Sequence, residues 1–151
     1  MIRTRLKDAL KAAQKEKDKC SVSTLRLITA ALKDRDIAAR CKGTMDGIDE
    51  DEVLGLLQSM VNQRRESIEL YEKGGRMELA QQEAEEIAII EQFLPEQLTT
   101  DEINEAIQGV IDEFGAANLK EMGKVMGALK ERYAGRMDFG KASAMVKGRL
   151  G

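Results

Sequence analysis

The chain has 151 residues, of which 42% are hydrophobic and 34% are charged. With one proline and no long uncharged apolar segment, this composition excludes a membrane-spanning helix and favours a soluble, helix-rich protein of one or two small domains. Histidine is absent, so the commonest general base and the commonest metal ligand are both missing. Cys20 and Cys41 fit neither a disulfide framework nor a metal-ligand spacing, which indicates ordinary thiols in a reducing compartment.

The formal net charge of −3 conceals three blocks of alternating sign. Residues 1–45 hold 12 Lys and Arg against 5 Asp and Glu, residues 46–115 hold 4 against 19, and residues 116–151 hold 8 against 3. Charge that is segregated along a chain indicates either pairing of the blocks within the molecule or a polyanionic partner. The charge blocks alone do not distinguish pairing within the molecule from a polyanionic partner.

The first two predicted helices follow from apolar residues that recur every three or four positions. The apolar face of the first helix is Ile2, Leu6, Ala9, Leu10 and Ala13. That of the second is Leu25, Ile28, Leu32 and Ile37. The N-terminal segment is basic and amphipathic, and no apolar run follows its charges as in a signal peptide. We therefore expect it to be mature structure in a cytoplasmic protein.

Capping signals delimit the next two helices. Asp49 precedes Glu52 by the three residues of a capping box, which predicts the start of a third helix, and Gly74–Gly75 predicts its end. A fourth helix should stop at Leu94, because Pro95 disfavours helical dihedral angles at the residue before it.

A domain boundary is expected near residue 97, where a proline is followed by a second capping box at Thr99 and Glu102. Residues 1–97 would form an N-terminal helical hairpin or bundle of about four helices, and residues 98–151 a small three-helix domain. The last three helices are predicted over Asp101–Phe114, over Leu119–Tyr133 and after Asp138, with Gly115 and Gly135 as stop signals. The predicted fold class is all-α.

No motif in the chain carries recognisable chemistry. The segment that begins at Asp46 is superficially like a calcium loop, but Ile48 occupies the third ligand position, where an oxygen donor is needed. Clustered carboxylates on a charged helix most often form a solvated face. Those carboxylates are Glu83, Glu85, Glu86 and Glu91. We predict no catalytic residue, no cofactor and no metal site.

Two glycines in the segment Met122–Asp138 raise a question, because they lie inside a predicted helix. Gly123 and Gly127 should each cost about 1 kcal/mol relative to alanine. Both fall outside the apolar stripe, on a flank with three lysines, Lys120, Lys124 and Lys130. A bare backbone bordered by lysines would let phosphate or ribose approach closely. Alternatively, a neighbouring helix packs on the glycines.

A basic ridge at every fourth position marks the first helix, formed by Arg3, Lys7, Lys11 and Lys15. Like charges at this spacing destabilise a helix by roughly 0.2–0.5 kcal/mol per pair, so the ridge is best explained opposite negative charge. The acidic middle block, solvent or an anionic partner could supply the compensation. The few aromatic residues form no stacking platform, so an RNA partner would be recognised by its backbone and shape.

Three sequence blocks resemble the GatB/YqeY family. They are "STLRLITAAL" preceded by "KDK", "EEIAIIEQFLPEQLT" and "MGKVMGALKERYAGRMD". The resemblance implies an all-helical protein of two parts, whose C-terminal part is similar to the tail domain of the B subunit of the tRNA-dependent amidotransferase. That enzyme amidates misacylated Glu-tRNA(Gln) or Asp-tRNA(Asn) with glutamine as nitrogen donor, and its tail grips the outer corner of the tRNA.

The same resemblance has a clear limit. The large catalytic region of the amidotransferase, with its ATP and magnesium site, has no counterpart in 151 residues, and the glutaminase residues are also missing. The carbon–nitrogen ligase activity associated with the family is therefore not expected of this chain alone.

These observations predict a non-catalytic tRNA-interacting protein, or an accessory to tRNA-dependent amidation that acts with amidotransferase or aminoacyl-tRNA synthetase components. Gly123 and Gly127 would permit close approach. The expected phosphate contacts are Lys120, Lys124, Lys130, Arg132, Arg136, Lys141 and Lys147, and the basic ridge is a candidate second surface.

The alternatives are a protein–protein adaptor without RNA contact and an enzyme subunit completed by a partner. Basic helices covered by residues 46–115 would favour the adaptor, and an open basic face would favour RNA.

Overall fold

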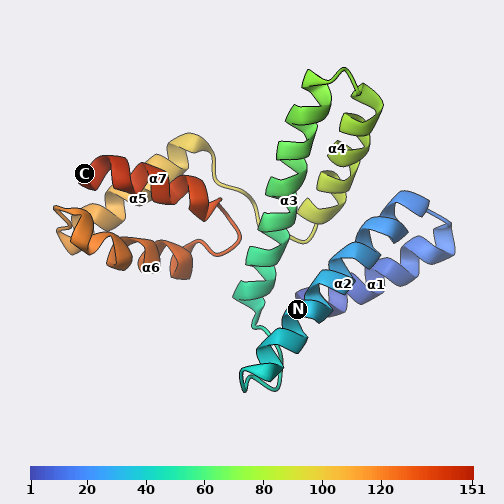
Figure 1. The fold of residues 1–151 in the computed structure, drawn as a ribbon. Coiled ribbons are helices and arrows are strands. Elements are labelled where there is room, and N and C mark those ends of the chain that lie inside the picture. The colour runs from blue at the N-terminus through green and yellow to red at the C-terminus, as the bar shows by residue number, and fades with distance from the viewer. The chain divides into compact units, whose positions relative to one another are not determined.

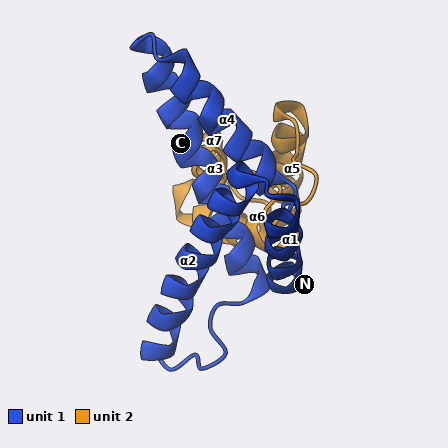
Figure 2. Ribbon diagram, turned by 90° about the vertical axis from the view of Figure 1, so that its right-hand side faces the viewer, with its two compact units in different colours: residues 1–94 blue, residues 95–151 orange.

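The structure of the protein, a computed structural model, describes all residues from 1 to 151 and contains seven α-helices and one short 3₁₀ helix. No strand is present, so the prediction of an all-α protein is confirmed. None of the helices combines the length and the hydropathy that a membrane crossing requires. The chain divides into two compact units, residues 1–94 and residues 95–151, which Figure 2 shows in different colours.

The N-terminal unit consists of two helical hairpins (Figure 1). Helices α1 (Ile2–Glu16) and α2 (Lys19–Cys41) form the first, and α3 (Glu50–Lys73) and α4 (Met77–Glu91) form the second. Helix α2 also packs on α4, which joins the hairpins. The fully buried side chains of this core include Ile28, Leu57 and Ile90.

The capping box predicted for α3 is confirmed. Asp49 Oδ1 accepts a hydrogen bond from the Glu52 backbone N–H at 2.9 Å, and Glu52 Oε1 accepts one from the Asp49 N–H. Helix α3 ends at the predicted position, with Gly74 as its C-cap. Helix α4 ends earlier than predicted, at Glu91, because the chain makes only a turn between this residue and Leu94.

One apolar residue of α2 was placed on the wrong face. Ile37 is 48% exposed and lies outside the core. Ile37 follows Leu32 by five residues, which at about 100° per residue places it about 140° around α2 from the buried stripe. The stripe continues at Asp36, which is buried and bonded to Arg3 of α1.

The C-terminal unit is a bundle of α5 (Thr100–Phe114), α6 (Met122–Arg132) and α7 (Phe139–Leu150). The buried side chains of the unit include Ile107, Val125, Leu129 and Val146 of these helices and Met137 of the loop before α7. The bundle has its own hydrophobic core, composed entirely of residues of this unit.

Helix boundaries in this unit follow the sequence signals with one difference. The capping box of Thr99 and Glu102 opens α5, and Gly115 ends it in the left-handed conformation, as predicted. The predicted helix over Leu119–Tyr133 instead begins with a 3₁₀ turn, Leu119–Glu121, and α6 ends at Arg132.

Backbone and side-chain hydrogen bonds tie the loop after α6 to the segment before α5. The Leu98 N–H donates to the Arg136 carbonyl at 2.8 Å, and Gln97 Nε2 donates to the Gly135 carbonyl at 2.6 Å. Gly135 lies in this turn with a φ of 74°. It does not itself cap α6, because the C-cap residue of that helix is Tyr133. These bonds fix the C-terminal end of α6 relative to α5.

Candidate nucleic-acid interface

The two glycines of α6 lie on its exposed side, away from the core of the C-terminal unit. Val125 and Leu129, on the other side of the helix, are completely buried. A Cβ atom added to Gly123 or Gly127 would meet no neighbouring atom within 4 Å. The alternative that a neighbouring helix packs on these glycines is therefore wrong, and folding leaves the strip open.

Lysines border this open strip. Lys124 follows Gly123 directly, and Lys130 follows Gly127 by three residues, which places it beside the same face of α6. Lys120 lies in the 3₁₀ turn just before the helix. All three side chains are exposed, and none forms an ion pair within the chain. We call the two glycines and these three lysines the glycine face.

Helix α7 carries a similar arrangement that the sequence analysis missed. Gly148 is exposed with open space around its Cα, and Ala144 precedes it by four residues on the same face. Lys141 and Lys147, both predicted phosphate contacts, are exposed and unpaired on this helix. The four-residue spacing of small residues next to lysines was the signal available in the sequence.

The two predicted arginine contacts are already engaged within the unit. Arg132 forms a two-pronged ion pair with Glu113 of α5, with nitrogen–oxygen distances of 2.6 and 2.9 Å. This hydrogen bonding raises the pKa of Arg132 and lowers the pKa of Glu113. Arg136 Nε donates to the Glu96 carbonyl at 3.1 Å. The free cations of this unit are therefore its lysines.

A third arginine of this unit, Arg149, was not among the predicted site residues. It donates to Asn104 Oδ1 at 3.0 Å and to Gln108 Oε1, and so joins α7 to α5. Its guanidinium group therefore holds these two helices together.

The predicted second basic surface divides into one structural residue and three free ones. Arg3 donates two hydrogen bonds to Asp36, at 2.6 and 2.8 Å, and one to the Ile48 carbonyl at 2.8 Å. Asp36 also accepts from the Ile48 N–H at 3.0 Å. The Arg3 hydrogen bonds are the main reason that the pKa of Asp36 is lowered to about 2. The remaining lysines of the ridge, Lys7, Lys11 and Lys15, are exposed and unpaired.

No group of three or more His, Cys, Asp and Glu residues is placed to hold a metal ion.

Glu83 and Glu86, two of the clustered carboxylates of α4, lie close to Arg64 of α3. Glu86 pairs with this arginine at 3.1 Å, and burial raises the pKa of Glu83. These residues help to hold the second hairpin together.

The chain belongs to the Yqey-like protein family, whose model matches residues 3–150. The resemblance seen in the three sequence blocks is thereby confirmed at the level of the family. Two relatives carry the name "Altered inheritance of mitochondria protein 41, mitochondrial". The chain is 35% identical over 89 residues to the protein of Vanderwaltozyma polyspora and 34% identical over 89 residues to that of Lachancea thermotolerans.

Both alignments cover 59% of this chain and 46% of the relative, so the matched region spans about half the length of those proteins. An uncharacterized protein of Schizosaccharomyces pombe is 29% identical over 96 residues, which is 64% of this chain and 71% of that protein.

Proposed function

We propose that the protein binds folded RNA, and tRNA in particular, through the glycine face of its C-terminal unit, and that it catalyses no reaction alone. The observation that carries this proposal is the open strip at Gly123 and Gly127, bordered by lysines without intramolecular partners. Phosphate groups meet both of their requirements at such a surface, namely close approach and positive charge.

The geometry of α6 suits a sugar–phosphate backbone. Four residues of an α-helix rise about 6 Å, so the two glycines leave a bare strip about one turn long. Without Cβ atoms on this strip, a ribose or phosphate can contact the helix itself. Each lysine ammonium is a point charge on a flexible stem, so it can follow phosphates without first breaking an ion pair.

The aromatic residues favour recognition of backbone and shape. Tyr133 and Phe139 pack on the core of the unit, and only Phe114, at the end of α5, is substantially exposed. A reader of single-stranded bases needs several stacking surfaces in a row, which this unit does not offer. A folded RNA presents its phosphates in a fixed array and needs no such surfaces.

The resemblance of the sequence blocks supports the same proposal, because it implies that the C-terminal part is similar to the tail domain of the amidotransferase B subunit. We infer an accessory role in tRNA-dependent amidation, with amidotransferase or aminoacyl-tRNA synthetase components as further partners. Any carbon–nitrogen ligase activity would then belong to the partner enzyme. We place this role in the cytoplasm, where Cys20 and Cys41, both free thiols, would remain reduced.

The proposal is tested by measuring the affinity of the full chain for folded tRNA and for duplex DNA across a salt series. Log affinity for tRNA should fall by about 0.7–0.9 per phosphate contact for each log unit of salt. Lys124→Ala should weaken tRNA binding several-fold and reduce this slope by about one contact. Lys73→Ala is the matched control, because Lys73 is an exposed, unpaired lysine of the other unit.

Equal affinity for tRNA and duplex DNA would contradict recognition of a folded RNA. A salt slope that Lys124→Ala and Lys73→Ala change equally would contradict the assignment of the glycine face.

The adaptor hypothesis is the second candidate. It is favoured by the Arg132–Glu113 pair, in which a cation of the basic C-terminal block is neutralised by the acidic block. Absence of salt-dependent tRNA binding would leave this hypothesis as the better account of the chain.

A further inference from the structure

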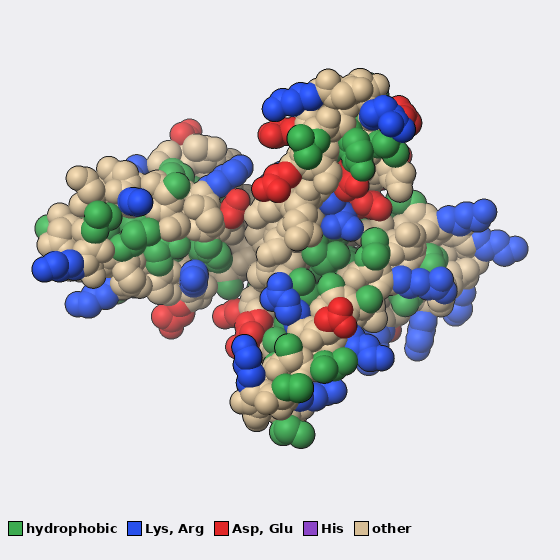
Figure 3. All heavy atoms as spheres, viewed as in Figure 1, with side chains coloured by type: hydrophobic (Ala, Val, Ile, Leu, Met, Phe, Trp, Pro, Cys, Tyr) green, Lys and Arg blue, Asp and Glu red, His purple; other side chains and the backbone are tan.

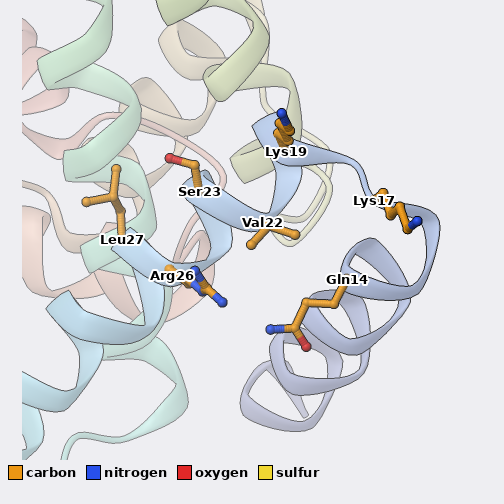
Figure 4. A pocket seen from close by; sticks show the side chains of 7 residues that line it. All are labelled: Gln14, Lys17, Lys19, Val22, Ser23, Arg26 and Leu27. Atoms are coloured by element: carbon orange, nitrogen blue, oxygen red, sulfur yellow. The ribbon is translucent and has the colours of Figure 1, made fainter.

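The first helical hairpin carries two hollows that are lined by residues of α1, α2 and the turn between them. A hollow of about 720 Å³ lies beside the N-terminal half of α2, where Gln14, Lys17, Val22, Arg26 and Leu27 line it (Figure 4). A second hollow, of about 390 Å³, lies between the start of α1 and the C-terminal half of α2. We call the two hollows together the hairpin groove.

One face of α2 connects the two hollows. Val22 and Arg26 line the first, and Thr29, Lys33 and Arg40 line the second. Their spacings of four, three, four and seven residues place them on one side of a helix. The two hollows are therefore bordered by the same side of α2.

The rim of the hairpin groove is strongly positive. The cations of the first hollow are Lys17, Lys19 and Arg26, and those of the second are Arg3, Lys7, Lys33 and Arg40. The only carboxylate in either lining is Asp36, which Arg3 already neutralises. The space-filling view shows the same imbalance, with many Lys and Arg side chains and few acidic ones over α1 and α2 (Figure 3).

The floor of the hairpin groove is apolar. Leu27 is 47% exposed although it is a large hydrophobic residue, and Val22 is half-buried beside it. Leu6 and Leu32 line the floor of the second hollow. In Figure 4 the Leu27 and Arg26 side chains project from successive positions of α2 in different directions, and both line the first hollow. The first hollow thus offers apolar contact at Leu27 and Val22 together with unpaired cations.

We propose that the hairpin groove binds an acidic amphipathic helix of a partner protein. Such a helix would place an apolar stripe on Val22 and Leu27 and direct carboxylates to the cations of the rim, as in other helix-in-groove complexes. Helix α1 has 15 residues and is therefore about 22 Å long, which accommodates about four turns of a docked helix.

A nucleic acid fits this groove less well than a peptide. Residues 1–45 contain no Phe, Tyr or Trp, so no base could stack there. A phosphate backbone gains nothing from the apolar floor, because the charged phosphates would lose water there without a polar partner. This inference is independent of RNA binding at the glycine face, because that face belongs to the other unit of the chain.

The test uses a labelled synthetic helical peptide of about 18 residues, with leucines at the i, i+3, i+4 and i+7 positions and glutamates on the flanks. Binding to the full chain is measured by fluorescence anisotropy, and the site is mapped by NMR shifts of backbone amides. A shuffled peptide of identical composition keeps the charge and removes the amphipathic pattern. We expect the shuffled peptide to bind at least about tenfold more weakly, with shifts confined to α1 and α2 for the amphipathic one.

Two pairs of variants separate the contributions of charge and apolar contact. Arg26→Glu should weaken the amphipathic peptide about tenfold or more, whereas Lys73→Glu, the same reversal on α3, should leave its affinity unchanged. Leu27→Asp should also weaken binding, whereas Leu70→Asp should not. Leu70 is a fair control because it is 70% exposed on α3 of the same unit. None of the four side chains belongs to the core, so folding should persist.

Each contrary result would overturn the proposal. Equal binding of the two peptides, or loss with Arg26→Glu but not with Leu27→Asp, would indicate unspecific attraction of a polyanion. Absence of peptide binding, together with tRNA affinity that depends on Arg26, would assign the groove to nucleic acid. Binding of anionic phospholipid vesicles in place of the peptide would assign it to a membrane surface.

Discussion

One arginine in each of the two units forms a two-pronged ion pair, and the units expose different lysine surfaces. In the first, Arg3 binds Asp36 with both arms of its guanidinium group, and in the second Arg132 binds Glu113 in the same way. Lysines form no ion pair in either unit. A guanidinium fork is suited to fixed two-pronged contacts, whereas an ammonium group stays hydrated and mobile. A basic stripe in a sequence can therefore contain two kinds of cation, those that are held in ion pairs within the fold and those that remain free.

The glycines of the two units also differ, because the fold requires one of them and does not require the other. Gly47 has a φ of 85°, and a Cβ added there would collide with the Asp36 carboxylate. The fold of the N-terminal unit therefore requires this glycine. Gly127 lies in a regular helix with open space around it, so the fold of the C-terminal unit does not require it.

The largest expected effect concerns the ion pair between Arg3 and Asp36. Asp36→Ala removes the carboxylate that satisfies Arg3 and the Ile48 N–H, so it should lower the unfolding free energy of the N-terminal unit by about 2–4 kcal/mol. Urea denaturation measures this change. Asp34→Ala, on the exposed side of the same helix, should change stability by less than about 0.5 kcal/mol. Similar losses in the two variants would show that the Arg3–Asp36 pair does not anchor the unit.

A smaller effect should appear in the pH dependence of stability. The pKa of Asp36 is lowered to about 2 in the folded chain, below the usual value of 3.8. The carboxylate therefore stabilises the fold fully above its unfolded pKa, and this contribution, about 2 kcal/mol, disappears as the pH falls through the folded pKa. Unfolding measured between about pH 5 and pH 2 should show a steeper loss in the wild type than in Asp36→Asn. Parallel curves would contradict this role of Asp36.

The smallest expected effect concerns the stability of variants at Gly127, Gly109 and Gly47. Gly127→Ala should raise the unfolding free energy of the C-terminal unit by about 0.5–1 kcal/mol, because alanine favours a helix and finds open space there. Gly109→Ala, at an equally open position of α5, should raise it similarly. Gly47→Ala should act in the opposite direction on the other unit. A loss of stability with Gly127→Ala would mean that folding itself needs this glycine.

Local sequence signals accounted for most of the fold. Capping boxes such as Asp49–Glu52 and stop signals such as Gly115 depend on residues close in sequence, and the helices begin or end there. The error at Ile37 was one of helical geometry, because this residue lies about 140° around α2 from Leu32 and the buried stripe continues at Asp36. A buried aspartate could not be expected from an apolar pattern, because the ion pair with Arg3 that stabilises it joins two helices.

The candidate site was predicted in part for a similar reason. Helical spacing was enough to place Gly123, Gly127 and their lysines on one flank, because they belong to one helix. The partners of Arg3 and Arg132 lie on other helices, so their ion pairs could not be read from spacing. The hairpin groove was missed because it combines residues of α1 with residues of α2.

The most direct test of the central claim, that the glycine face receives a folded RNA, is the tRNA affinity of Gly127→Leu beside that of Gly109→Leu. Both positions are exposed helical glycines of the same unit with open space around them, so neither change should lower thermal stability. We expect Gly127→Leu to weaken tRNA binding at least about tenfold and Gly109→Leu to leave it unchanged. Unchanged tRNA affinity in a folded Gly127→Leu protein would contradict RNA binding at the glycine face.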